Sequence, residues 1–249
     1  MKNLIDLTNE EMADVFARWN EGKLRSYLIE ITSNILRHKD KSGGYLIDKI
    51  LDAAGQKGTG KWSVINAMEL GMPLGLIATA VFERSLSAQK DLRHLASNQF
   101  MCKHTLPIYN KADLVEEIFS ALYASKLVSY AQGFAVLQRA SDAFGWNLDL
   151  ASIARMWRGG CIIRSIFLND IAAAFEATDK PKHLLLAPYF KEEMKKQGFV
   201  ISDLSVSLKD GSFAPLPFTA SGTVRYDFEL EHYLSDYPKL YYTWHLEVV

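Results

Sequence analysis

Residues 110–144, NKADLVEEIFSALYASKLVSYAQGFAVLQRASDAF, decide the fold because apolar residues recur at helical spacing through the whole stretch. Only Gly133 interrupts the pattern, and Gly145 follows it as a residue type that commonly ends a helix. A helix of this length predicts a central element that is buried on more than one side.

Shorter helical patterns lie on both sides of this element. Thr8 and Glu11 have the spacing of a capping box, and the apolar residues from Leu24 to Ile35 predict a long helix or a helix pair that ends near Lys39. A second short helix is expected around residues 47–51. Further helices are expected from about residue 62, from residues 71–73 to about residue 97, at 150–157, at 161–178 and after residue 181.

The last fifty residues change to a period of two, which is typical of half-buried antiparallel strands. The alternation covers residues 224–230 and 240–248, and Asp210-Gly211 predicts a hairpin turn between two shorter strands. We therefore expect a mainly α protein with a small antiparallel β tail. The expected division is a helical domain at residues 1–199 and a β-rich tail at residues 200–249.

Charge and cysteine content exclude several classes of protein. The 28 Lys and Arg residues balance 29 Asp and Glu residues, so no global field favours nucleic acid or an anionic membrane surface. The two cysteines, Cys102 and Cys161, have no CxxC partner, and the segment Cys102-Lys103-His104 lacks a third metal ligand. We expect a cytoplasmic protein without a signal peptide, a membrane span or a metal site.

The stretch AGQKGTGKW at residues 54–62 is the strongest candidate for chemistry. Its three glycines let backbone N–H groups approach an anion, and its two lysines and one threonine supply charge and a donor. The spacing resembles a Walker A loop, but Trp62 stands where that loop has Ser or Thr, which argues against nucleotide hydrolysis. A surface turn with solvated lysines explains the same residues equally well.

Three segments, MWRGGCIIRS at 156–165, ALYASK at 121–126 and SYAQGF at 129–134, give the sequence a resemblance to a known family. Together with the stretch at 54–62, they resemble the all-helical C-terminal domain of decarboxylating 6-phosphogluconate dehydrogenase. The resemblance covers most of residues 3–197. It implies that Lys57, Thr59 and Arg84 hold the phosphate of 6-phosphogluconate or another anionic sugar acid, and that the chain forms a homodimer. Arg158 and Arg164 are interpreted as structural, because arginines in an apolar segment commonly satisfy helix-end carbonyls or pair with carboxylates.

The sequence also departs from this family. No GxGxxG follows a strand pattern, so NADP, the cofactor of the family, is not expected to bind this chain alone, and a separate Rossmann subunit is one way to supply it. The family's catalytic Lys and Glu are expected to be absent, which leaves no catalytic residue to assign and leaves open whether the chain is an enzyme. The Arg-Asp-Tyr-Phe-Gly-x-His motif of the family's tail is absent. Arg225-Tyr226-Asp227-Phe228 with His232 resembles it only loosely, with a spacing that differs by one residue. The alternative is a repurposed helical scaffold that binds a partner protein.

Overall fold

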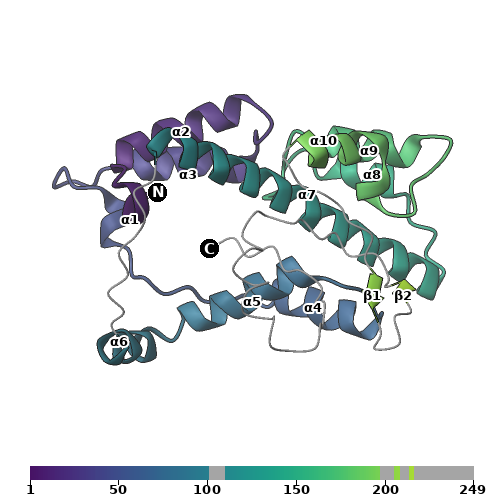
Figure 1. Ribbon diagram of the computed structural model, residues 1–249, viewed down its shortest axis with the longest axis horizontal. Coiled ribbons are helices and arrows are strands. Elements are labelled where there is room, and N and C mark those ends of the chain that lie inside the picture. Colours follow the sequence, from purple (N-terminus) through teal and green to yellow (C-terminus); the bar gives the residue numbers. More distant parts are fainter. Residues whose placement is uncertain (101–109, 197–204, 208–212, 216–249) are drawn as a thin grey trace.

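Helix α7 (Lys111–Phe144) runs diagonally through the molecule in the computed structural model, which describes residues 1–100, 110–196, 205–207 and 213–215 (Figure 1). Asn110 caps its start by accepting a hydrogen bond from the amide of Ala112 at 2.9 Å, and Gly145 ends it with a φ of 65°. Residues 123–125, 127 and 128 are all buried. Because neighbouring residues of a helix point in different directions, this confirms a central helix that is buried on more than one side.

The remaining elements are short compared with α7. They are α1 (Lys2–Ile5), α2 (Asn9–Glu21), α3 (Tyr27–Arg37), η1 (Leu46–Lys49), α4 (Thr59–Glu69), α5 (Gly75–Ser87), α6 (Lys90–Gln99), α8 (Leu150–Met156), α9 (Leu168–Glu176), η2 (Leu184–Leu186), α10 (Pro188–Lys196), β1 (Ser205–Ser207) and β2 (Phe213–Pro215).

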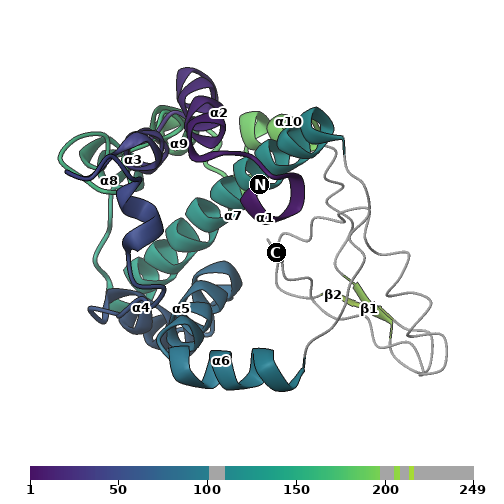
Figure 2. The ribbon, with the colours of Figure 1, turned by 90° about the vertical axis from the view of Figure 1, so that its left-hand side faces the viewer.

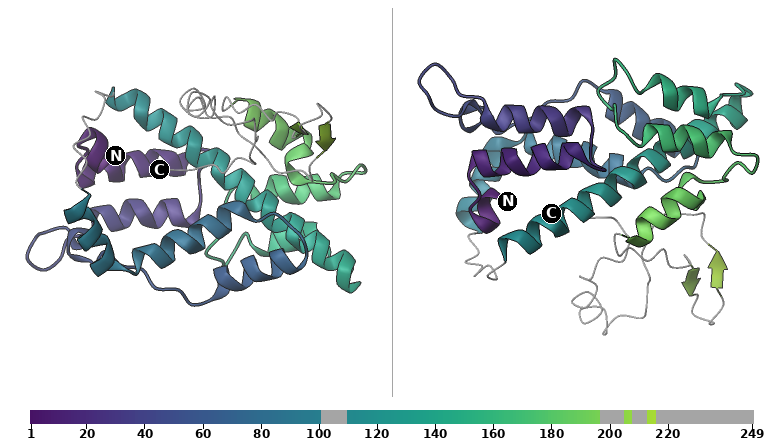
Figure 3. Two further views of the ribbon diagram at one scale, coloured as in Figure 1. Left: turned by 60° about the horizontal axis from the view of Figure 1, so that its bottom comes forward. Right: turned by 90° about the horizontal axis from the view of Figure 1, so that it is seen from above.

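One hydrophobic core joins α2, α3, α7, α8, α9 and α10. Its largest fully buried side chains include Tyr123, Phe134, Phe167 and Phe190. Helices α2 and α3 lie beside one end of α7, and α8, α9 and α10 lie further along it (Figures 1 and 3). We call these helices the body.

Helices α4, α5 and α6 lie on the other side of α7 (Figures 1 and 2). We call residues 50–100, which comprise these helices and the loop before them, the arm. Within the described part of the chain, Ala67 and Leu74 are the buried hydrophobic residues of the arm. The amide of Leu76 donates to Oε1 of Gln132 at 3.2 Å, and Nε of Arg139 donates to the carbonyl of Leu70 at 3.3 Å. The arm is therefore attached to α7 by few buried side chains and by two polar contacts.

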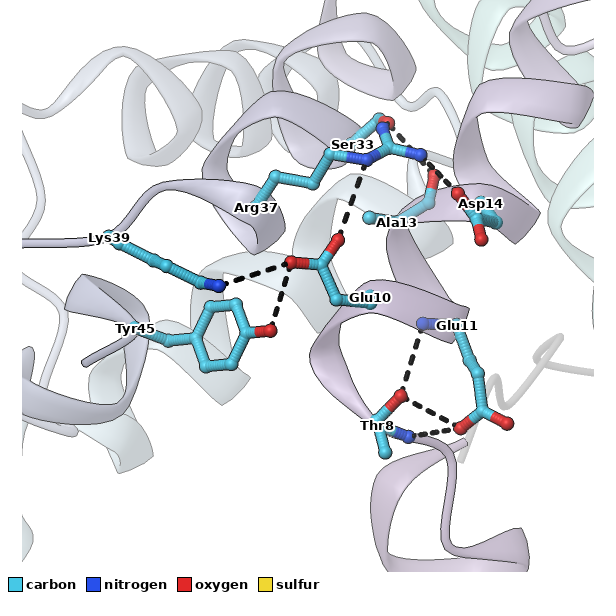
Figure 4. A network of polar contacts seen from close by, with 9 residues as sticks. All are labelled: Thr8, Glu10, Glu11, Ala13, Asp14, Ser33, Arg37, Lys39 and Tyr45. Atoms are coloured by element: carbon cyan, nitrogen blue, oxygen red, sulfur yellow. Dashed lines mark hydrogen bonds and ion pairs between the residues drawn. The ribbon is translucent and has the colours of Figure 1, made fainter. Parts of the chain in front are cut away.

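The expected helix pair at the start of the chain is confirmed as α2 and α3, and polar contacts join the two helices (Figure 4). Thr8 and Glu11 form the predicted capping box. Arg37 of α3 donates to Ser33 at 2.6 Å and pairs with Asp14 of α2, and Tyr45 donates to Glu10 at 2.9 Å. These contacts fix the chain that leads from α3 towards the arm.

Two predicted helices differ from the structure. The expected helix up to residue 97 is broken between α5 and α6, where Arg93 of α6 donates to the carbonyl of Ser87 at 3.1 Å and so caps the end of α5. The helix expected at 161–178 begins only at Leu168. Residues 164–166 pair instead with residues 25–27, through Tyr27 N–H to the Arg164 carbonyl and Ile166 N–H to the Arg25 carbonyl, both at 3.0 Å.

Smaller differences concern the ends of elements. The short helix expected at residues 47–51 is the 3-10 helix η1, and the helix expected from about residue 62 begins at Thr59. Strands β1 and β2 pair antiparallel with Val206 opposite Ala214, on either side of the predicted Asp210-Gly211 turn. That turn and the alternating stretches 224–230 and 240–248 lie outside the described residues.

Candidate functional site

The glycine loop, residues 50–58, leads from η1 to the first turn of α4. Gly58 precedes the helix with a φ of 99°, in the left-handed region that disfavours side chains, and Trp62 lies over it. The first helical hydrogen bond runs from Trp62 N–H to the Gly58 carbonyl at 2.9 Å. The amides of residues 59–61 therefore precede the hydrogen-bonded part of α4, which is the arrangement that favours anions.

Helix α5 holds the glycine loop through side chains of two adjacent residues. Nε of Arg84 donates to the carbonyl of Gly55 at 2.6 Å. Nε2 of Gln56 donates to Oγ of Ser85 at 2.7 Å, and Ser85 in turn donates to the Val81 carbonyl at 3.0 Å. The loop is thus fixed to α5 at two consecutive positions.

Close packing continues at the start of α4. A Cβ atom at Gly60 would lie 3.0 Å from Cγ2 of Val81, so a larger residue there would require Val81 to shift by a few tenths of an ångström.

Helix α6 contributes a third attachment. Nη1 of Arg93 donates to Oδ2 of Asp52 at 3.0 Å, and Nη2 donates to the Asp52 carbonyl at 2.6 Å. The hydrogen bond from Arg93 lowers the pKa of the Asp52 carboxyl below its usual value. The start of the glycine loop is therefore tied to the junction of α5 and α6.

The structure brings the residues predicted from the sequence to one part of the arm. Lys57 is an exposed residue of the loop, and Thr59 is the exposed first residue of α4. Arg84 is exposed on α5 and contacts the loop two residues before Lys57. Its Nε donates to the Gly55 carbonyl, and among the described residues its two Nη atoms have no hydrogen-bond partner, so both remain available to a ligand.

This arrangement has the chemistry of an anion site. It combines two cationic side chains, a hydroxyl group and the amides at a helix N-terminus, all of which donate to anionic oxygens. Within the ranges that the structure describes, no group of three His, Cys, Asp or Glu side chains is placed to hold a metal ion. None of the described helices is both long and apolar enough to cross a membrane.

The interpretation of Arg158 and Arg164 as structural residues is confirmed. Arg158 donates to the Arg155 carbonyl at the end of α8 at 3.2 Å and to Asn169 at 2.8 Å. Arg164 pairs with Glu30 at 2.9 Å. Both arginines therefore make their contacts with residues of the body.

Two partly buried ionisable residues were not singled out from the sequence. Burial lowers the pKa of the Lys126 ammonium to about 8, and its Nζ donates to Oγ of Ser26 at 2.8 Å. Burial also lowers the pKa of His183 to about 4, and its Nδ1 accepts from the Leu185 amide at 3.4 Å. Lys126 therefore joins α7 to the residue before α3, and His183 caps the start of η2.

The sequence matches the family described as 6-phosphogluconate dehydrogenase, C-terminal domain, over residues 1–216. The chain belongs to this family. Its relatives include the decarboxylating 6-phosphogluconate dehydrogenase of Schizosaccharomyces pombe, which is 49% identical over 79% of this chain and 40% of that protein. The enzyme of Mus musculus is 50% identical over 77% of this chain and 40% of that protein. The enzyme of Lactococcus lactis subsp. cremoris is 45% identical over 91% of this chain and 48% of that protein.

A solved structure supports the same family. Plasmodium falciparum 6-phosphogluconate dehydrogenase superposes with a TM-score of 0.74 and 41% identity, over 79% of this chain and 43% of that one. That enzyme has been solved in its apo form, with its cofactor NADP+ and with its substrate 6-phosphogluconate. The fold is therefore the mainly helical C-terminal domain of 6-phosphogluconate dehydrogenase, and the chain spans less than half the length of these relatives.

Proposed function

We propose that this chain supplies the sugar-phosphate-binding part of a decarboxylating 6-phosphogluconate dehydrogenase. Lys57, Thr59 and Arg84 bind the phosphate of 6-phosphogluconate. The observation that carries this proposal is the hydrogen bond from Arg84 to the Gly55 carbonyl, because it unites the cation of α5 with the glycine loop. A phosphate dianion held by two cations and a hydroxyl forms charge-assisted hydrogen bonds, which are stronger than neutral ones.

In the reaction of this family, a base removes the proton of the 3-hydroxyl while hydride passes to NADP, and the resulting β-keto acid loses carbon dioxide. The residues of this chain orient the substrate and hold its phosphate, which contributes binding energy at a distance from the reacting carbon. We assign no hydride-transfer or proton-transfer residue to them. The nicotinamide cofactor is expected to be held by a Rossmann fold outside residues 1–249, and a separate Rossmann subunit is one way to supply it. The proposed location is the cytoplasm.

Titration calorimetry with 6-phosphogluconate tests the assignment. Replacing Lys57 or Arg84 by alanine removes a charge-assisted hydrogen bond worth about 1.5–3 kcal/mol, a factor of about 10 to 150 in Kd. Thr59→Val is expected to have a smaller effect, because the lost donor is neutral. Lys41→Ala, which removes an exposed charge from the loop after α3, serves as the control and should bind like the unchanged protein.

Binding is expected in the millimolar range, because the chain provides only part of the site. Equal affinity of the unchanged protein, Lys57→Ala and Arg84→Ala would contradict the phosphate assignment.

We also propose that the chain forms a homodimer through the arm. Its helices leave large apolar side chains exposed, including Met68 and Phe100 at 75%, Phe82 at 68% and Leu95 at 60%. Exposed apolar surface of this extent marks an association surface in soluble proteins. A second copy of the chain offers the same apolar helices and so makes an isologous contact.

Sedimentation equilibrium tests this second proposal. Phe82→Glu is expected to shift the protein to monomer, whereas Glu116→Lys, a change of charge on an exposed residue of α7, should leave the dimer intact. A dimer that survives Phe82→Glu but disappears when residues 200–249 are deleted would assign association to the tail. That result would favour the alternative of a scaffold whose tail docks a partner.

A further inference from the structure

Arg93 occupies a place in the arm that the phosphate assignment does not use. It lies on α6, and its guanidinium reaches the Asp52 side chain at 3.0 Å, the Asp52 carbonyl at 2.6 Å and the Ser87 carbonyl at 3.1 Å. These acceptors belong to the start of the glycine loop and to the last residue of α5. One side chain therefore joins the loop, α5 and α6.

The glycine loop depends on contacts of this kind. Among the described residues, its backbone makes few hydrogen bonds of its own between Asp52 and Gly58, so side chains of α5 and α6 determine its path. Arg84 and Ser85 attach Gly55 and Gln56, and Arg93 attaches Asp52. At its far end, the loop enters α4 at Thr59. Asp52 and Thr59 are thus the two fixed ends of the segment that carries Lys57.

The geometry of Arg93 indicates that the loop contacts determine where the guanidinium lies. Its Nε is buried and has no hydrogen-bond partner among the described residues. Leaving a buried donor without a partner is unfavourable. Nη2 nevertheless keeps both carbonyl acceptors, at Asp52 and Ser87, and Nη1 keeps the Asp52 carboxylate, which gives the residue three contacts across separate segments.

We propose that Arg93 is a positioning residue for the phosphate site, which fixes the entry of the glycine loop against the α5–α6 junction and thereby sets the place of Lys57 relative to Arg84. This rests on the proposed function for the identity of the ligand. The carbonyl contacts dominate the effect, because Asp52 is 74% exposed at its side chain and an exposed ion pair contributes little. Releasing one end of a short loop increases the number of conformations that it samples, so both the loop and the bound phosphate lose order.

Hydrogen exchange of the ligand-free chain tests the positioning directly. Arg93→Ala is expected to accelerate exchange of the hydrogen-bonded amides of Ala53 and Trp62, at the two ends of the loop, about tenfold. Asp52→Ala should accelerate them about threefold, since it removes the side-chain acceptor but keeps the carbonyl. Lys90→Ala is the matched control. Lys90 lies at the start of the same helix and acts on the Asp52 carboxyl through its charge, without the carbonyl contacts that Arg93 makes. Its loss should therefore leave the loop unchanged. Unchanged exchange in α7 checks that the fold is intact.

Titration of the same variants with 6-phosphogluconate, and with inorganic phosphate as the minimal probe, links the loop to binding. Arg93→Ala should weaken both ligands about tenfold, and Arg93→Lys should not restore binding, because an ammonium lacks the planar fork that reaches separate acceptors. Equal loop exchange and equal affinity in Arg93→Ala and the unchanged protein would overturn the proposal. If the unchanged protein binds neither ligand, the proposed function fails, while the exchange rates still decide whether Arg93 fixes the loop.

Discussion

Replacing Gly58 by alanine tests whether the left-handed residue before α4 is needed for the site. Gly58 has a φ of 99°, and a side chain in the left-handed region costs about 1–2 kcal/mol. The added Cβ would also lie 3.2 Å from Cζ2 and 3.3 Å from Cε2 of Trp62. Because the Trp62 side chain is 57% exposed, it can move aside and adds little to this cost. We therefore expect Gly58→Ala to lower the free energy of unfolding by about 1–2 kcal/mol.

Urea unfolding measures this change, and Gly43→Ala provides the matched control. Gly43 has a φ of 82°, and a Cβ built there meets no described atom within 4 Å, so the same backbone strain arises outside the arm. Both variants should lose similar stability, but only Gly58→Ala should weaken 6-phosphogluconate binding, because residues 57 and 59 flank the altered position. Gly58→Asn should lose less stability, since asparagine tolerates left-handed backbone.

The reasoning would be refuted if Gly58→Ala unfolded at the same urea concentration as the unchanged protein. Equal loss of binding in Gly43→Ala and Gly58→Ala would show that binding follows global stability and not the local path of the loop.

Three further predictions concern the body. Burial lowers the pKa of His183 to about 4, so as the pH falls the unfolded chain binds the proton of this residue before the folded protein does. The free energy of unfolding, measured with urea, should therefore fall by about 1.5 kcal/mol between pH 6.5 and 5 relative to His183→Asn. Burial lowers the pKa of Lys126 to about 8, so the folded protein releases this proton at a lower pH than the unfolded chain does. The free energy of unfolding should therefore rise by about 1.5 kcal/mol between pH 8 and 9.5 relative to Lys126→Met, and the same pH dependence in both proteins would contradict this. Glu193 is buried and accepts from Lys23 at 2.5 Å and Tyr123 at 3.0 Å, so Glu193→Leu should cost about 3 kcal/mol in thermal or urea unfolding, while the exposed Glu192→Leu should cost little.

Helix existence was predictable from the sequence where periodicity was long and the caps were local. Helix α7 follows from its apolar spacing, Asn110 and Gly145, and α2 follows from the capping box of Thr8 and Glu11. The end of α5 was not predictable in this way. Helix α5 ends at Ser87, where Arg93 of the following helix donates to the Ser87 carbonyl. No local sequence pattern predicts such a contact.

The late start of α9 has a similar cause. Residues 161–167 carry a helical pattern, but the backbone at 164–166 pairs with residues 25–27, more than a hundred positions earlier. Tertiary pairing overrides local propensity at such places. The local sequence of residues 161–167, taken without its pairing to residues 25–27, favours a helix.

The candidate site was partly predictable. The composition of residues 54–62 offered two lysines and one threonine, whereas the choice of Lys57, Thr59 and Arg84 came from the family resemblance. Without the resemblance, Arg84 is interpreted as an ordinary charge on a helix surface. The contact of Arg84 with Gly55 and the attachments made by Ser85 and Arg93 needed the structure. Lys126 and His183 were missed because burial, which shifts their pKa values, depends on residues distant in the sequence.

The division between body and arm explains why the site depends on polar attachments. Apolar burial is the main favourable term in folding, and within the described chain α5 and α6 contribute no buried residue to it. The arm should therefore open at lower free energy than α7, and its amides should exchange before those of the central helix. A ligand that bridges Lys57 and Arg84, or a second copy that covers Phe82, binds the closed arm in preference to the open one. Either should slow exchange in α5 with little change in α7, because binding stabilises only the state that carries the site.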